Sequence, residues 1–86
     1  ENKMMYIATF YSHFGAVRFK KECKKNNISA EAMPVPRDLS SSCGTCVKFE
    51  TDKDIGTFTW SQEVEQVVEI TESGYVTHYH IEISEK

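Results

Sequence analysis

Long apolar runs are missing from this chain of 86 residues, and so is the pattern that opens a secretion signal. No stretch approaches the roughly 18 apolar residues that a membrane-spanning helix requires. The first residues do not pair a basic segment with an apolar core. We therefore expect a cytoplasmic protein without membrane contact. Its length suffices for one domain over residues 1–86, too small for a deep cavity with its own lid.

Cysteine is also scarce, with three in the chain. Small secreted domains usually carry a dense, even number of cysteines that form disulfides. Cys23 falls within a helical pattern, whereas Cys43 and Cys46 are separated by only two residues. We therefore predict a reducing compartment, in which Cys43 and Cys46 are functional thiols or metal ligands rather than a structural disulfide.

An excess of basic charge, which nucleic-acid-binding domains usually have, is missing as well: the net charge is −3. Residues 1–49 carry eight Lys/Arg and four Asp/Glu, a balance of +4, and residues 50–86 carry two and nine, a balance of −7. The basic residues between 18 and 25 are best interpreted as the solvated face of one helix, so no nucleic-acid partner is expected. Without a Gly-rich phosphate loop or a distinctive carboxylate pair, a carrier or accessory protein is favoured over a stand-alone enzyme.

The hydrophobic pattern predicts four strands and two helices. The strands are expected over 4–10, 29–35, 46–51 and 75–83. The first helix is expected over 13–26, with Ser12 as its N-cap. The second is expected over 60–72, since Thr59 and Gln62 fit a capping box and the valines that follow form an apolar stripe. Gly74 would end this second helix.

The resulting order, β-α-β-β-α-β, is typical of an α+β, ferredoxin-like fold. It predicts a four-stranded antiparallel sheet with both helices on one face. We expect the irregular segment 36–46 to lie at the end of the sheet where the helices finish, with His13 at the opposite end. Since a helix C-terminus disfavours a thiolate, support for an anionic Cys43 would come from Arg37, Lys24, Lys25 or the loop's own N–H groups.

The segment Cys43-Gly44-Thr45-Cys46 is the strongest chemical feature of the sequence. Two intervening residues allow two sulfurs to approach each other or to share a metal ion, and a reactive thiol beside a second thiol can carry sulfur or exchange disulfides. Gly44 leaves space beside Cys43, and the hydroxyls of residues 40–42 (Ser40, Ser41 and Ser42) can hydrogen-bond an anionic sulfur or selenium group. The structural alternative is a turn before a strand, with Cys46 partly buried.

A metal site would need two further ligands. His78 and His80 alternate on the last predicted strand, but that strand is expected to neighbour the first, away from the thiols. Two solvent-facing histidines are therefore favoured, and we expect neither a metal nor a cofactor. A thioredoxin-like function is disfavoured because the cysteines precede a strand rather than begin a helix.

Residues 33–44, Met-Pro-Val-Pro-Arg-Asp-Leu-Ser-Ser-Ser-Cys-Gly, resemble a family of small bacterial domains described as selenium/sulfur carrier-like proteins. The opening Tyr-Ile-Ala-Thr-Phe-Tyr at 6–11, followed by a helix, is similar too. The resemblance covers about residues 5–50 well and the rest only by pattern. It implies a role near selenium or sulfur metabolism, with Cys43 as the carrier thiol. Because an apolar residue is common in the family where Cys46 stands, a resolving or an incidental role for Cys46 stays open.

Three hypotheses follow. In the first, Cys43 accepts sulfur or selenium from a donor protein for an acceptor protein, Arg37 favours the Cys43 thiolate, and Cys46 is a possible resolving thiol. In the second, the chain is a metal-binding or non-catalytic interaction domain, which an edge strand would allow to form a homodimer. In the third, Cys43 and Cys46 exchange disulfides.

Overall fold

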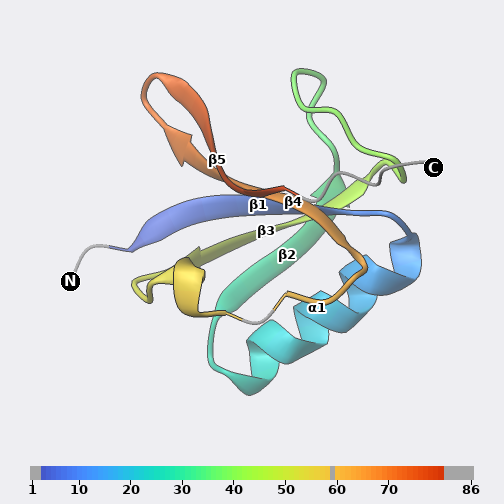
Figure 1. The fold of residues 1–86 in the computed structure, drawn as a ribbon. Helices are drawn as coiled ribbons and strands as arrows, with labels where there is room; N and C mark the ends of the chain where they lie inside the picture. The colour runs from blue at the N-terminus through green and yellow to red at the C-terminus, as the bar shows by residue number, and fades with distance from the viewer. Residues whose placement is uncertain (1–2, 59, 81–86) are drawn as a thin grey trace.

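The computed structural model of the protein describes residues 3–58 and 60–80, shown in Figure 1. Its elements are β1 Met4–Phe10, α1 His13–Lys25, β2 Ser29–Pro34, β3 Thr45–Thr51, a short 3-10 helix η1 Ile55–Thr57, β4 Val64–Thr71 and β5 Gly74–His80. The strands form one sheet in the order β2-β3-β1-β4-β5, with antiparallel neighbours throughout, and α1 packs against one face. No helix among these residues is long and apolar enough to cross a membrane.

The first half of the chain folds as its pattern predicts. Strands over 4–10, 29–35 and 46–51 and a helix over 13–26 are confirmed to within one residue at each end. Ser12 caps α1, because its hydroxyl accepts the main-chain N–H of Gly15 at 3.2 Å. The predicted last strand is confirmed up to residue 80, and residues 81–83 lie outside the described part.

The ferredoxin-like prediction is wrong. The described chain holds one α-helix and five strands, and β4 occupies the region where a helix over 60–72 was predicted. Thr59 of the predicted capping box lies outside the described residues. Gly74 does not end a helix: it begins β5 with a φ of +125°, directly after a two-residue hairpin turn in which Thr71 faces Gly74 across the ladder.

A β-bulge explains the misread helix. Thr9 pairs with Gln66 whereas Phe10 pairs with Val64, so Glu65 is an extra residue in β4. The extra residue puts Val64 and Val67 on the same face of the sheet although they are three residues apart. That spacing is typical of a helix, but the β-branched residues of this segment favour a strand.

The sheet separates two apolar cores, because successive side chains of a strand point to opposite faces. The larger core lies under α1 and contains the following buried residues: Tyr6, Ala8, Phe10, Ala16, Cys23, Val47, Phe49, Ile55, Val64 and Val67. The smaller core lies on the other face, around Ile7, Cys46 and Val68. Val35 and Leu39 of the loop between β2 and β3 pack on this smaller core. The loop therefore rises from the face opposite α1 (Figure 1).

An irregular crossover, described at 52–58 and 60–63, joins β3 to β4 and covers the start of the predicted second helix. It crosses the face of the sheet that carries α1, where buried Ile55 and half-buried Phe58 and Trp60 pack against the larger core. Trp60 also contacts Tyr79 of β5, with ring centroids 5.6 Å apart. Among the described residues, the layer beside α1 thus holds this crossover, in which η1 is the regular element.

Candidate functional site

The thiol loop, residues 35–44, connects the paired ends of β2 and β3. Its base is closed by the main-chain N–H of Val35, which donates to the carbonyl of Gly44 at 3.1 Å. Gly44 has a φ of +80°, a conformation that residues with a Cβ rarely adopt. A Cβ built at Gly44 would meet nothing within 4 Å, so this position needs glycine for its backbone conformation, and the space beside Cys43 is open.

Glu65 of β4 holds the loop close to Cys43. The carboxylate of Glu65 accepts two hydrogen bonds from Ser42, one from its main-chain N–H at 3.1 Å and one from its hydroxyl at 3.0 Å. The hydroxyl of buried Thr9 donates to the same carboxylate at 3.3 Å. Glu65 is the bulge residue of β4, and the bulge directs its side chain to the loop.

Two further contacts tie the outer part of the loop to β4 and β5. The side-chain amide of Gln66 donates to the carbonyl of Ser40 at 3.0 Å, and the hydroxyl of Tyr75 donates to the Asp38 carboxylate at 3.1 Å. Burial, and then the hydrogen bond to Asp38, raise the pKa of Tyr75 above its ordinary value. The thiol loop is therefore held against the sheet through Asp38, Ser40 and Ser42.

Cys43 is half-buried at the end of this loop and packs against the larger core. The main-chain N–H of Thr45 donates to the Cys43 sulfur at 3.4 Å, and the thiol donates to the Thr45 carbonyl, also at 3.4 Å. The main-chain N–H of Cys43 donates to the Ser41 hydroxyl at 3.4 Å. The Cys43 sulfur thus both accepts from and donates to the main chain of Thr45.

The predicted position of the loop relative to the helix is wrong. β1 and β2 are both antiparallel to β3, so they run in the same direction, and β2 ends level with the start of α1. His13, the first residue of α1, accordingly lies beside the loop, with its Nδ1 3.4 Å from the Thr45 hydroxyl. Lys24 and Lys25 lie at the other end of the helix, about 17 Å away along its axis.

The remaining predicted residues of the loop are placed as follows. Arg37 is exposed and forms no hydrogen bond or ion pair with another residue of the described chain. Ser40 contacts β4 through its carbonyl, whereas the hydroxyls of Ser41 and Ser42 bond to the Cys43 amide and to Glu65. An action of Arg37 or of these serines on a sulfur or selenium group stays a prediction.

Cys46 lies in a different environment from Cys43. It belongs to the smaller core with 0% of its surface exposed, and its thiol donates to the Pro34 carbonyl at 3.8 Å. Burial, and then the charge of Cys43, raise the pKa of the Cys46 thiol to about 11. Cys23 is also buried, with a pKa raised to about 11 by burial and then by Glu22. All three cysteines are free thiols, and the two of the CxxC segment pack into different cores.

Groups that bind metals are not gathered around the thiols. In the region that the structure describes, no three His, Cys, Asp or Glu side chains converge to hold an ion. His78 instead lies 2.8 Å from the Glu69 carboxylate and contacts the edge of the Tyr6 ring, on the face that carries α1. The side chain of His80 lies outside the described part.

Sequence reasoning missed two residues of the site, Glu65 and His13. Glu65 falls within the helix predicted over 60–72, and only the bulge in β4 brings it to Ser42. His13 was placed at the wrong end of the sheet, although strand directions alone put the start of α1 and the loop between β2 and β3 at the same end. The correct strand topology is enough to place His13 beside the loop, whereas no local sequence signal indicates the contact between Glu65 and Ser42.

Comparison with known proteins supports the family resemblance given by the loop. The family model described as "Putative Se/S carrier protein-like" matches residues 5–71, from the second residue of β1 to the end of β4, and includes the complete thiol loop. Comparison with curated proteins and with solved structures gives no match. The family model covers well over half of the chain, so the protein belongs to the Putative Se/S carrier protein-like family.

Proposed function

We propose that the protein carries sulfur or selenium on Cys43 between a donor and an acceptor protein. The observation that carries this proposal is the contrast between its three thiols. Cys23 and Cys46 are buried with pKa values raised to about 11, whereas Cys43 is half-buried with a main-chain amide 3.4 Å from its sulfur. A sulfur nucleophile must be accessible to its partner, and Cys43 is the thiol that meets this requirement.

In the loading step, the Cys43 thiolate attacks the outer sulfur of a cysteine persulfide on the donor. The new S–S bond forms at Cys43 while the donor's own S–S bond breaks, and the donor cysteine leaves as a thiolate. In the delivery step, a nucleophile of the acceptor attacks the outer sulfur, and the Cys43 thiolate leaves. Neither step needs an oxidant or a reductant, because the transferred sulfur keeps its oxidation state. A selenium atom would follow the same two steps.

The loop offers groups that would hold the charged outer atom. The exposed guanidinium of Arg37 would attract an anionic persulfide or selenide, and the open space at Gly44 would admit the reacting group of a partner. The proposal gives Cys46 no part in transfer, because a resolving thiol must reach Cys43 as a thiolate, and burial opposes both. Its resolving role stays a separate prediction, which labelling of the thiols in the folded protein can test.

Intact mass spectrometry tests the proposal. The protein is incubated with a cysteine desulfurase and free cysteine, and we expect a gain of one sulfur atom that a reducing agent removes. Cys43→Ser should show no gain, whereas the matched variants Cys23→Ser and Cys46→Ser, once shown to be folded by circular dichroism, should still be loaded. Loading of Cys43→Ser at the wild-type level, or no loading of the wild type, would contradict a carrier thiol at position 43.

A further inference from the structure

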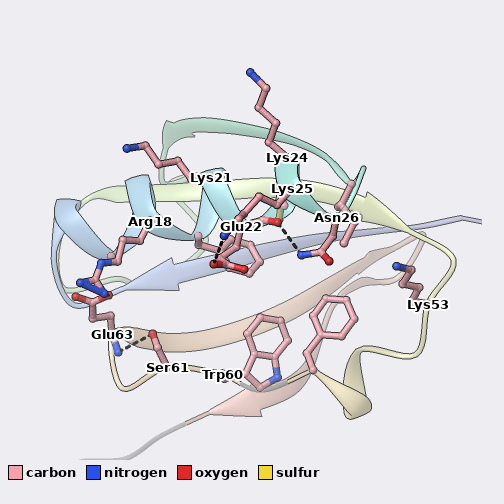
Figure 2. Close-up of a pocket in the computed structure, with 15 residues that line it drawn as sticks. Arg18, Lys21, Glu22, Lys24, Lys25, Asn26, Lys53, Trp60, Ser61 and Glu63 are labelled. Carbon is pink, nitrogen blue, oxygen red and sulfur yellow. Dashed lines mark hydrogen bonds and ion pairs between the residues drawn. The ribbon is translucent and has the colours of Figure 1, made fainter.

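A groove runs beside α1, between the helix and the crossover 52–63 (Figure 2). Its volume is about 1120 Å³. Three half-buried aromatic side chains line its floor, Phe19 from α1 and Phe58 and Trp60 from the crossover. The ring centroid of Trp60 lies 5.7 Å from that of Phe19 and 5.3 Å from that of Phe58, so the three form a continuous apolar surface.

The lining of this helix groove is basic, although the chain as a whole carries −3. It has two carboxylates, Glu22 and Glu63, and five cationic groups, a balance of +3. The cationic groups are Arg18, Lys21, Lys24, Lys25 and Lys53.

The two carboxylates are already engaged. Glu63 lies 3.9 Å from Arg18, and Glu22 lies 3.8 Å from Lys25. Three ammonium groups therefore have no carboxylate partner among residues 3–58 and 60–80: Lys21, Lys24 and Lys53. All three residues line the groove. Figure 2 shows Lys53 at the crossover side, whereas Lys21 and Lys24 extend from α1 on the side away from Trp60.

We propose that the helix groove docks an acidic amphipathic helix of a partner protein. Such a helix would place its apolar stripe on the aromatic floor and its carboxylates against the unpaired lysines, in the helix-in-groove mode. The fold supports this occupant, because within residues 3–58 and 60–80 the layer beside α1 holds only the irregular crossover and η1. α1 has 13 residues, so a partner helix of about 20 Å, or three to four turns, would lie along it.

A nucleic acid fits these observations less well. Base stacking needs exposed aromatic faces, whereas Phe19, Phe58 and Trp60 are half-buried against the core and against one another. The net charge of −3 also opposes a long polyanion, whose binding depends on many phosphate contacts. The docking proposal concerns residues apart from the thiol loop and does not depend on a carrier function of Cys43.

Trp60 allows a direct test, because it is the single tryptophan of the chain and lies in the groove floor. The probe is a synthetic peptide of about 14 residues with Leu at helical i, i+3, i+4 and i+7 spacing and Glu elsewhere. It is compared with a permuted peptide of identical composition, with a version carrying Lys for Glu, and with oligouridine RNA. We expect a saturable change in Trp60 fluorescence with the first peptide only, weakened by salt.

Charge-reversal variants locate the binding. The double variant Lys21→Glu/Lys53→Glu should bind the acidic peptide about tenfold more weakly, since rim charges steer and hold a complementary partner. The matched control Lys3→Glu/Lys20→Glu makes the same change in net charge at exposed positions that do not line the groove, and it should retain wild-type affinity. Circular dichroism of both variants establishes that they are folded.

The outcomes separate the possibilities. Equal losses in both double variants, or equal binding of the permuted peptide, would show nonspecific charge attraction and overturn the proposal. Binding of oligouridine in place of the peptide would assign the groove to nucleic acid instead. No fluorescence change at millimolar peptide would show that this surface does not take an acidic helix.

Discussion

The Glu65 carboxylate accepts both the main-chain N–H and the hydroxyl of Ser42, at 3.1 and 3.0 Å. This pair joins the residue directly before Cys43 to the bulge of β4, 23 residues further along the chain. Hydrogen bonds to a charged acceptor are stronger than those between neutral groups. The position of the Cys43 sulfur therefore depends on a carboxylate that lies outside the loop.

Replacing Glu65 should loosen the thiol loop without unfolding the sheet. In Glu65→Ala the N–H and hydroxyl of Ser42 lose their acceptor, as does the hydroxyl of buried Thr9. We expect a stability loss of about 1–3 kcal/mol in urea unfolding, together with faster hydrogen exchange at the Ser42 amide. The matched control is Glu72→Ala, an exposed carboxylate of the β4–β5 turn. Unchanged exchange at Ser42 would show that Glu65 does not hold the loop.

The backbone at Gly44 makes a second prediction. Its φ of +80° and its open surroundings indicate that an added side chain would be strained by conformation alone. Gly44→Ala should therefore cost about 1 kcal/mol of folding free energy. Gly44→Asn should cost less, because asparagine tolerates positive φ better than alanine does. Urea unfolding measures both variants, and an equal or larger cost for asparagine would contradict this explanation.

Buried thiols predict how stability depends on pH. Cys23 and Cys46 have pKa values raised from 9.0 to about 11, chiefly by burial, so folding favours their neutral forms. The stabilisation that this preference adds to the free energy of unfolding is complete below about pH 9. It is lost as the pH rises from about 9 to 11, by up to about 3 kcal/mol for each thiol. Unfolding by urea at pH 7, 9 and 10.5 measures this loss.

The variant Cys23→Val/Cys46→Val is the control for the alkaline loss. It should lose less stability between pH 9 and 10.5 than the wild type does, because both thiol titrations are removed. A smaller loss should persist, since burial also raises the pKa values of Tyr6 and Tyr75. Parallel pH profiles for the variant and the wild type would show that the two thiols do not titrate in this range.

Local signals explain which parts of the fold were predictable. The run of β-favouring residues at 4–10, the N-cap Ser12 and the helical spacing of residues 16–23 each act within a few positions, and the structure follows them. The second half was misread at Glu65, where one extra residue in β4 gives Val64 and Val67 the spacing of a helix. A bulge depends on pairing with β1, which is more than 50 residues away, so no local pattern indicates it.

Some residues of the site were likewise predictable from local sequence, and others depend on the sheet topology. Cys43 was found because its spacing from Cys46 and its Pro/Ser-rich surroundings are visible in the sequence. The spacing did not reveal that the two cysteines pack into opposite cores, because Cys46 takes part in the alternation of β3 while Cys43 precedes it. Glu65 and His13 reach the loop only through the sheet topology, which depends on pairing between distant strands.

The different environments of Cys43 and Cys46 lead to the last prediction, which concerns thiol reactivity in the folded protein. Cys43 is half-buried beside open space at Gly44, whereas Cys23 is 2% exposed and Cys46 is 0% exposed. A maleimide reagent should therefore modify one thiol rapidly under native conditions. The other two should react only through unfolding, at least about a thousandfold more slowly in a domain of ordinary stability.

Peptide mass mapping after brief labelling identifies the modified cysteine, and Cys43→Ser should abolish the rapid phase. Under denaturing conditions all three thiols should react, which shows that the reagent can modify each of them. Rapid native labelling of Cys46 would show that the loop opens easily over the smaller core. In that case Cys46 would have access to a persulfide on Cys43, and the resolving role that its burial opposes would become the better assignment.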